Sequence, residues 1–418
     1  MRILFLSNYY PPFEVGGYEQ LCRDVAVRLQ DRGHEIAVLT SDRGKEQYGA
    51  LAEPGVFRLL RIQPNNEMHL SIAMQFFLTR NRAEKYNRCV FLMLLKQVNP
   101  DIIFIWNLQG LPQELSLDAE ASELPVAYWL AGYSPAEPDL FWRFWDQQPQ
   151  LRIGLAGFKR VIAKIAFAQM RHEGKPVRPE MSNVSVVSNY MRSYGIEQGT
   201  LAGHPEIIYN GIEVNDFYRP VPPVDSPPPV RILIAGRVTP DKGIHVAVEA
   251  LGMVSLARPQ RDFRLIIAGD GSPNYIRQLK NLISFWHVED LIEFSGWMPR
   301  EEIPSLMHSC QILLHSAIHP EAFARVILEG MAAGLAVVGT LTGGTGELLI
   351  ERENGLTCAA ENSHEMAEKI EILLDDPAFR FQLACNGQKR VIGEFSLDRM
   401  VDRLENFLKR AVAEHGDA

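Results

Sequence analysis

Two glutamates, Glu321 and Glu329, lie eight residues apart in the segment HPEAFARVILEGMAAGLAVVGT (319–340). We expect Glu321 just before a helix and Glu329 two turns inside it, among aliphatic side chains. A carboxylate in such surroundings is costly to bury without a hydrogen-bonding partner. Glu329 therefore points to solvent, pairs with an arginine, or accepts hydrogen bonds from a ligand diol such as a ribose. The spacing alone leaves these alternatives open.

A basic loop precedes this segment, in AGRVTPDKGIHVAVEAL (235–251). A predicted strand ends at Gly236, and Arg237 and Lys242 lie between that strand and the next helix. Two cations at the carboxyl end of a parallel strand suit a diphosphate, and the helix start adds N–H donors and a positive dipole end. The alternative is an ordinary loop with two solvated cations.

Glycines recur in two further loops. Gly343 and Gly344 in TLTGGTGELLIERENG (340–355) would let the backbone approach a ligand closely, although a glycine cluster alone is more often a turn. Gly16 and Gly17 follow the first predicted strand. Neither loop has the GxGxxG spacing, so a dinucleotide site is poorly supported.

Several other chemistries have no pattern in the sequence. No two aspartates are separated by a single residue, which excludes a DxD metal clamp, and HExxH and GxSxG are absent. The five cysteines form no CxxC pair, so neither a disulfide framework nor a zinc site is indicated. The net charge of −9 argues against a nucleic-acid binder, which usually carries a basic excess. We therefore expect no metal, no cofactor and no nucleic acid.

Short, continuously apolar runs alternate with stretches of helical spacing. The runs predict strands at 3–6, 35–40, 101–106, 125–130 and 183–188, and then at 231–236, 263–269, 292–296, 311–316 and 336–340. Apolar strands separated by helices are typical of parallel sheets covered on both faces. Six prolines in the twelve residues of 219–230 separate the two series. The sequence thus predicts an α/β protein with two Rossmann-like, doubly wound domains.

The chain also carries a basic segment, residues 151–178, with seven Arg or Lys against one Glu. Apolar side chains alternate with these cations, so the segment is either a solvated helix or a surface for an anionic membrane or an anionic acceptor. The first apolar run is too short for a signal peptide, and no stretch approaches the ~18 apolar residues of a membrane span. We expect a cytoplasmic protein, in which a solvated helix at 151–178 is favoured and peripheral contact with the inner membrane face is the alternative.

Taken together, these motifs resemble the retaining glycosyltransferases of family four, which have the GT-B fold. The resemblance runs from the first strand to about residue 395. It rests on motifs in the right order: the double glycine 16–17, YNGIEVNDF (209–217), GRVTPDKG (236–243), AGDG (268–271), the two glutamates, and GGTGE (343–347). Their order on either side of the proline-rich segment is far more specific than any one motif.

The resemblance implies two domains facing a cleft and a role for each motif. Residues 1–215 would form the acceptor-side domain and residues 216–395 the nucleotide-sugar domain, with helix 396–416 crossing back onto the first. The implied roles are diphosphate binding by Arg237 and Lys242, ribose binding by Glu329, a donor-sugar contact by Glu321, a lining by the backbone of Phe323, Ala324, Gly343 and Gly344, and closure over the diphosphate by Gly16 and Gly17.

The function implied is retaining transfer of a sugar from a nucleotide-sugar donor, a UDP-sugar, to a saccharide or lipid-linked acceptor in polysaccharide or glycoconjugate biosynthesis. Preorganised cations would stabilise the departing nucleoside diphosphate without a metal. Two departures keep alternatives open: Ala131 and Gly132 replace a common His-Asp, and Ala324 replaces a glycine. The alternatives are a nucleotide-sugar-binding protein without turnover and a nucleotide-sugar epimerase.

Overall fold

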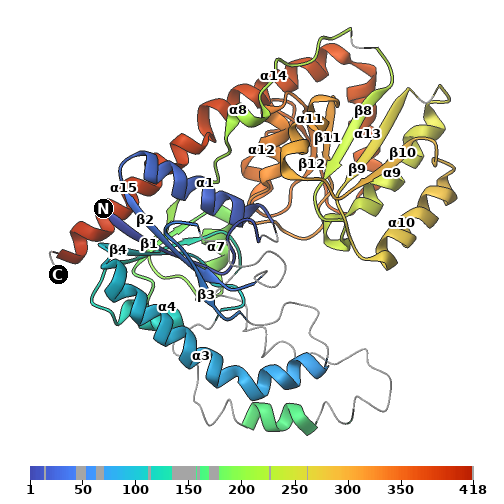
Figure 1. The fold of residues 1–418 in the computed structure, drawn as a ribbon. Helices are drawn as coiled ribbons and strands as arrows, with labels where there is room; N and C mark the ends of the chain where they lie inside the picture. Colours follow the sequence, from blue (N-terminus) through green and yellow to red (C-terminus); the bar gives the residue numbers. More distant parts are fainter. Residues whose placement is uncertain are drawn as a thin grey trace. The chain divides into compact units, whose positions relative to one another are not determined.

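The computed structural model describes residues 1–13, 16–43, 53–62, 70–111, 114–133, 157, 161–168, 178–225, 227–260 and 262–416, with only the backbone of 70–77. The chain divides into two compact units. The first comprises Met1–Val186, Arg192–Ile208 and Val401–Ala418, and the second comprises Val187–Met191 and Tyr209–Met400. Figure 1 shows the elements of both units.

A seven-stranded parallel sheet forms the centre of the first unit, in the order β3-β2-β1-β4-β5-β6-β7. Its strands are β1 (Arg2–Ser7), β2 (Glu35–Ser41), β3 (Val56–Leu60), β4 (Ile102–Asn107), β5 (Val126–Leu130), β6 (Asn183–Val186) and β7 (Glu206–Ile207). The order reverses direction between β1 and β4, as in a doubly wound sheet. Its core includes the buried rings of Trp106 and Trp129, whose centroids lie 4.1 Å apart.

Helices cover both faces of this sheet. They are α1 (Gly17–Asp31), α3 (Leu70–Val98), α4 (Glu114–Glu120), α7 (Asn189–Glu197) and the part of α15 (Leu397–Gly416) from Val401 onward. In Figure 1, α1 and α15 lie on one side of the strands, and α3 and α4 lie on the other. The apolar strands expected from the sequence are therefore buried from both sides.

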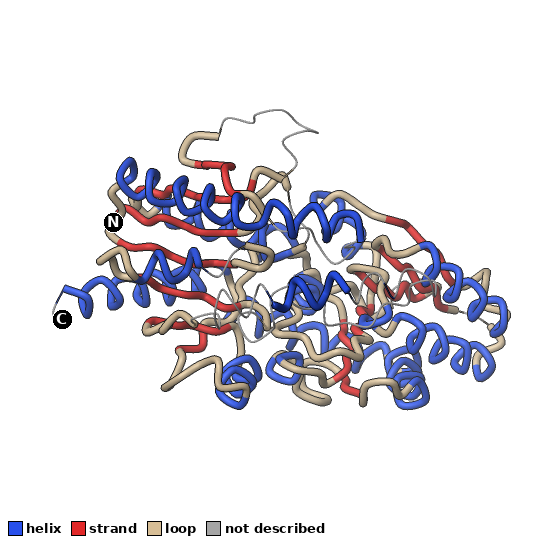
Figure 2. The backbone as a smooth tube through the Cα atoms, turned by 90° about the horizontal axis from the view of Figure 1, so that it is seen from below, coloured by secondary structure: helices blue, strands red, loops and turns tan. Residues whose placement is uncertain are grey.

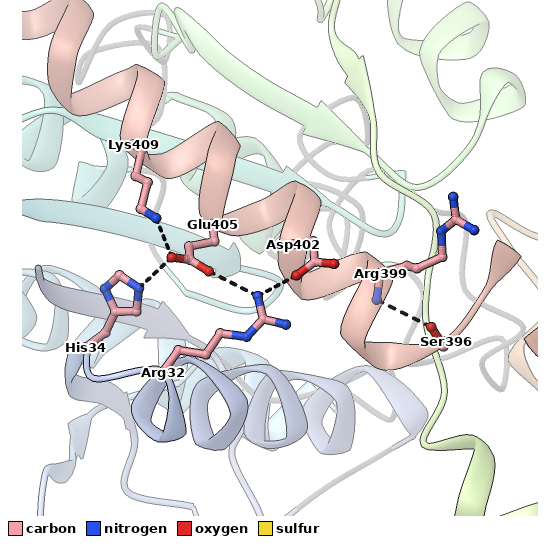
Figure 3. Close-up of polar contacts among 7 residues, drawn as sticks. All are labelled: Arg32, His34, Ser396, Arg399, Asp402, Glu405 and Lys409. Carbon is pink, nitrogen blue, oxygen red and sulfur yellow. Dashed lines mark hydrogen bonds and ion pairs between the residues drawn. The ribbon is translucent and has the colours of Figure 1, made fainter. Parts of the chain in front are cut away.

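A charged cluster attaches α15 to the first unit (Figure 3). Arg32 Nη1 donates to Asp402 Oδ1 at 2.7 Å and to Glu405 Oε2 at 3.0 Å. His34 Nε2 lies 3.2 Å from Glu405 Oε1, and Lys409 binds the same oxygen. Hydrogen bonds from Lys409 and Arg32 lower the pKa of Glu405 to about 2, more than offsetting the opposite effect of its partial burial. The last helix of the chain is thus held by ion pairs to the turn between α1 and β2.

The second unit has a six-stranded parallel sheet in the order β10-β9-β8-β11-β12-β13. Its strands are β8 (Val230–Ala235), β9 (Phe263–Ala268), β10 (Ile292–Gly296), β11 (Ile312–His315), β12 (Ala336–Thr340) and β13 (Leu356–Cys358). Figure 2 shows strands flanked by helices in each unit. The expected fold of two doubly wound parallel sheets is confirmed, since both orders reverse at an interior strand.

The second unit carries most of the shorter elements. Its helices are α8 (Val214–Phe217), α9 (Ile244–Ala257), α10 (Pro273–Trp286), α11 (Ile303–His308), α12 (Arg325–Ala332), α13 (Ser363–Asp375) and α14 (Pro377–Glu394), with single 3₁₀ turns η1 (Pro240–Lys242), η2 (Arg300–Glu302) and η3 (Gly344–Glu347). Among these helices, α9 packs against α10 and α13, and α12 packs against α14.

The proline-rich segment 219–230 belongs to the second unit by its contacts. Arg219 donates to the carbonyl oxygens of Cys310 at 2.8 Å and Ala333 at 3.2 Å, and its own carbonyl accepts from Gln388. The chain passes between the units after Val186, Met191, Ile208 and Met400. Every helix in the described ranges is too short or too polar to span a bilayer.

Candidate functional site

The basic loop after β8 begins where two strand ends approach closely. Gly236 N donates to Ala268 O at 2.9 Å, and a Cβ on Gly269 would lie 1.8 Å from Gly236 O. Only glycine fits there, because any side chain on residue 269 would overlap the carbonyl. Arg237 follows with an exposed side chain that makes no ion pair with a described residue. The guanidinium is therefore available to an anion.

Lys242 closes the same loop and is fixed against the end of β11. Gly243 has a φ of +60°, and a Cβ there would lie 2.0 Å from Ser316 O. Ser316 Oγ in turn donates to Lys242 O at 2.8 Å. The Lys242 ammonium forms an ion pair with Glu321 Oε1. The loop thus brings together a cation and an acid that are far apart in the sequence.

The position of Glu321 depends on the glycines of the GGTGE loop. Glu321 pairs with Gly343 in a parallel bridge, and Gly344 N donates to Glu321 O at 2.7 Å. Gly343 has a φ of +58°, and a Cβ on it would lie 2.2 Å from Glu321 O. The glycine pair therefore allows two backbone segments to touch, which is a structural reason for glycine beside any role toward a ligand.

A buried histidine faces the same carboxylate. His315 ends β11, is 6% exposed, and has its Nε2 3.8 Å from Glu321 Oε1. Burial lowers the pKa of His315, and the nearby Lys242 acts in the same direction while Glu321 opposes it. Burial also raises the pKa of Glu321, but the opposing effects of His315 and Lys242 are larger and hold it below its ordinary value. Glu321 is therefore a carboxylate at neutral pH and cannot donate a proton there.

Phe323 and Ala324 join Glu321 to α12, and both are buried. The Phe323 ring stacks on Tyr209, with centroids 5.3 Å apart and planes at 26°, and lies 5.8 Å from the ring of Phe395. Ala324 is the N-cap residue of α12. This aromatic packing fixes the loop that carries Glu321 at its C-terminal side.

Glu329 lies two turns after Glu321 and is 8% exposed. Arg300 Nη1 donates to its Oε1 at 3.3 Å, and Arg325 Nη2 lies 3.9 Å from the same oxygen. The arginine pairing considered from the sequence is therefore present. This pairing engages only one oxygen of the carboxylate, because Glu329 Oε2 makes no hydrogen bond with a residue that the structure describes. The same holds for Glu321, whose Oε1 faces both Lys242 and His315.

Four contacts around this loop had no signal in the sequence. Glu347 Oε1 accepts from Tyr190 N at 3.0 Å, and its Oε2 accepts from Asn189 N at 2.9 Å and Tyr209 Oη at 3.0 Å. Ser188 Oγ donates to the carbonyl that follows Glu321 in the chain, at 2.8 Å. Glu347 thus caps the start of α7. These partners are more than a hundred residues apart, so no local pattern could have identified them.

The structure assigns the remaining predicted site residues to the first unit. Gly16 and Gly17 lie at the start of α1, where Gly16 N donates to Glu19 Oε2 at 2.9 Å. Ala131 and Gly132 directly follow β5, and Ala131 is buried. Every other predicted site residue lies in the second unit.

Two further expectations concern ligands outside the donor loops. Within the described ranges, no group of three or more His, Cys, Asp or Glu side chains is placed to hold a metal ion. Most of the basic segment 151–178 lies outside the described residues. Its helical part, residues 161–168, exposes Val161 by 59% and Ile165 by 56%.

Residues 218–390 match the family described as glycosyl transferases group 1. A putative glycosyltransferase of Bacillus subtilis, YtcC, is 28% identical over 265 residues, which are 58% of this chain and 62% of that protein. An alpha-D-kanosaminyltransferase of Streptomyces kanamyceticus is 30% identical over 173 residues, 41% of this chain and 44% of its own length. The chain thus matches about half of the length of these relatives.

Solved structures are similar over nearly the whole chain. Anabaena HepE, solved in complex with UDP-glucose, superposes with a TM-score of 0.68 at 22% identity, covering 98% of this chain and 100% of HepE. At this identity the likeness concerns the fold. The family match covers the basic loop, both glutamates and the GGTGE loop, which are the parts of the site built in the second unit.

Proposed function

We propose that this chain, which has the GT-B fold, is a group 1 glycosyl transferase, and that it transfers a sugar from a UDP-sugar to a saccharide or lipid-linked acceptor with retention of configuration. One observation carries the proposal. Glu321 and Glu329 each have one oxygen engaged by cations and a second oxygen without a partner among the described residues, and Arg237 and Lys242 lie in the adjoining loop.

The two cations suit the diphosphate of the donor. Arg237 makes no ion pair with a described residue, so a phosphate oxygen can bind its guanidinium without breaking such a pair. Lys242 already pairs with Glu321, and its ammonium has three N–H donors, so it can contact the carboxylate and a phosphate together. Breaking the sugar–phosphate bond increases negative charge on the phosphate, which these fixed cations stabilise most in the transition state.

The charge state of Glu321 limits its role. Because its pKa lies below the ordinary value, Glu321 is ionised at neutral pH and is not a general acid. A carboxylate there can accept hydrogen bonds from sugar hydroxyls and stabilise positive charge that develops on the sugar. In a retaining displacement on one face, the departing phosphate oxygen would take the acceptor proton. Glu329 would accept from a ribose hydroxyl.

We also propose that transfer needs no metal, because Arg237 and Lys242 supply positive charge at the place where a divalent ion would otherwise neutralise the diphosphate. The measurement is the transfer rate after dialysis against a chelator, with and without added Mg²⁺ or Mn²⁺. An unchanged rate is expected. A rate that disappears on chelation and returns with the metal would contradict this part of the proposal.

A thermal-shift panel of UDP-, GDP- and ADP-sugars tests the proposed donor. Ligand at ~100 times its dissociation constant should stabilise the protein by ~2.7 kcal/mol. UDP-sugars should give the largest shift, and no shift with any nucleotide at saturation would end the proposal. Transfer should be lost in Glu321→Gln, whose neutral amide keeps the shape of the carboxylate. If Glu321→Gln turned over as fast as the natural chain, Glu321 would have no part in the reaction.

A protein that binds the donor without transferring it is the second candidate. The residues after β5, Ala131 and Gly132, favour it, since neither side chain can act as a base or donate a hydrogen bond. Donor binding in the panel together with undetectable transfer or hydrolysis would select this candidate. An epimerase would instead convert the donor sugar when no acceptor is added.

We propose in addition that segment 151–178 contacts an anionic membrane at the inner face, close to lipid-linked acceptors. Val161 and Ile165 are exposed one helical turn apart, with Lys164 exposed beside them. Apolar side chains that enter the headgroup region next to cations favour anionic lipid. Flotation with vesicles of anionic lipid at low salt should recover the protein, and Ile165→Asp should reduce that fraction. No flotation with the natural chain would reject the contact.

A further inference from the structure

Arg300 contacts one of the two donor-site acids, although nothing in the sequence pointed to it. It begins η2, which follows β10, whereas Glu329 lies in α12, which follows β11. The two residues therefore come from different β–α units of the second domain. Arg300 Nη1 donates to Glu329 Oε1 at 3.3 Å.

This contact restricts the orientation of the Glu329 carboxylate. A free glutamate carboxyl group turns about its last torsion angle, which is broad and roughly two-fold. Here Oε1 faces Arg300 and, at 3.9 Å, Arg325. Both cations engage the same oxygen, so Oε2 is directed away from them and has no partner among the described residues. An acceptor atom in a mostly buried side chain is thereby kept available.

Arg300 is itself held on a second side. Its guanidinium lies 5.8 Å from the centroid of the Phe217 ring, and Phe217 is 1% exposed in α8. The Arg300 side chain is 32% exposed. A planar guanidinium that rests on an aromatic face and donates from its edge has a defined plane, which lysine cannot reproduce. Arg300 is thus a fixed donor to Glu329.

We propose that Arg300 is a positioning residue that sets the preference of the donor site for a ribose with its hydroxyls intact. It does so by holding Oε2 of Glu329 where it accepts a hydrogen bond from the ribose. The inference rests on the nucleotide binding of the proposed function. A site built to bond a hydroxyl rejects an analogue without it, because the buried acceptor is then left unpaired. Without Arg300 the carboxylate would turn, and this rejection would weaken.

The test compares ribose and deoxyribose forms of the same nucleotide. Dissociation constants are measured by calorimetry for UDP, 2′-deoxy-UDP and 3′-deoxy-UDP with the natural chain, Arg300→Ala and Arg300→Lys. The natural chain should bind UDP at least about tenfold more tightly than the weaker deoxy analogue. In Arg300→Ala that ratio should fall below about threefold, with an intermediate ratio in Arg300→Lys.

Arg277→Ala is the matched control. Arg277 lies in α10 of the same unit, and its guanidinium donates to the exposed side chain of Asn274 at 3.4 Å. This variant should keep the ratio of the natural chain. A loss of folding or of general affinity in Arg300→Ala would weaken UDP and its deoxy analogues equally, so the ratio separates positioning from a structural role. If Arg300→Ala folds poorly, Arg300→Lys provides the same comparison.

The outcomes distinguish this inference from the proposed function. If the natural chain binds none of UDP, GDP and ADP, the proposed function fails and this inference fails with it. If the natural chain binds and discriminates between the ribose forms while Arg300→Ala and Arg300→Lys keep the full ratio, only the role of Arg300 is overturned. A natural chain that binds UDP and its deoxy analogues equally would also overturn it, and would leave donor binding intact.

Discussion

Arg237→Ala and Lys242→Ala should affect donor binding alike and stability differently. Both side chains are proposed to contact the diphosphate, so each substitution should weaken the affinity for a nucleoside diphosphate. Only Lys242 has a partner in the folded protein, since its ammonium pairs with Glu321, whereas Arg237 is exposed and makes no ion pair with a described residue. The two variants therefore separate the cost to folding from the cost to binding.

The magnitude follows from the exposure of the pair. Lys242 is 26% exposed and Glu321 is 18% exposed, so the pair lies between a surface pair and a buried one. Exposed pairs contribute about 0–1 kcal/mol, and removing one member of a buried pair costs about 3–5 kcal/mol. We therefore expect Lys242→Ala to lower the free energy of unfolding by about 1–3 kcal/mol. Arg237→Ala should change it by less than about 0.5 kcal/mol.

Urea unfolding without ligand measures the first effect, and calorimetry with UDP measures the second. A double-mutant cycle of Lys242→Ala and Glu321→Gln should give a coupling energy of about 1 kcal/mol or more, because the two side chains are in contact. The reasoning is refuted if the single variants are equally stable, or if the cycle is additive within about 0.3 kcal/mol. Unchanged UDP affinity in both variants would place the diphosphate elsewhere.

Two other substitutions have defined expected outcomes. Gly343→Ala should cost more than about 1 kcal/mol of stability and weaken UDP binding, because its φ of +58° is unfavourable for alanine and its Cβ would lie 2.2 Å from Glu321 O. The control is Gly346→Ala, whose Cβ would meet only Leu341 at 3.8 Å. Equal losses of stability in the two variants would contradict the prediction. Glu405→Gln should lower the free energy of unfolding above pH 4.5 by about 1–3 kcal/mol. The folded-state pKa of Glu405 is depressed to about 2, so this stability is present above its ordinary pKa and is lost as the pH falls through about 2. The difference in urea midpoint between the natural chain and Glu405→Gln should therefore shrink toward that pH. A difference that does not change with pH would contradict the prediction.

The strands that could be predicted from the sequence are those long enough to show a continuous apolar run. β1, β4 and β9 each have six residues and are buried along most of their length, and β8, also of six residues, is buried along half of it. The edge strands β3, β7 and β13 were missed: Arg58 interrupts the apolar run of β3, and β7 and β13 have only two and three residues. A run of two or three apolar residues carries no periodicity that distinguishes a strand from a loop. The order of strands within each sheet likewise depends on crossovers that no local pattern specifies.

The residues of the candidate site could be singled out from the sequence one by one, but their pairings could not. The sequence identified Arg237, Lys242, Glu321 and Glu329 one by one, because cations after a strand and acids at helix starts are local signals. The ion pair of Lys242 with Glu321 joins loops that follow different strands, β8 and β11. Such a contact arises only because carboxyl ends of neighbouring parallel strands meet at one edge of the sheet.

The loops of the candidate site place cations beside acids in a chain that is acidic overall. Lys242 pairs with Glu321, and Arg300 and Arg325 face Glu329. Arg237 lies in the same loop as Lys242, and Asp241 adds a carboxylate near Glu321. The chain as a whole has a net charge of −9, which repels a nucleoside diphosphate at long range. Salt screens charges beyond about 8–10 Å but acts much less on partly buried contacts. Under the proposed function, donor selection is therefore expected to come from contact with these side chains rather than from long-range attraction.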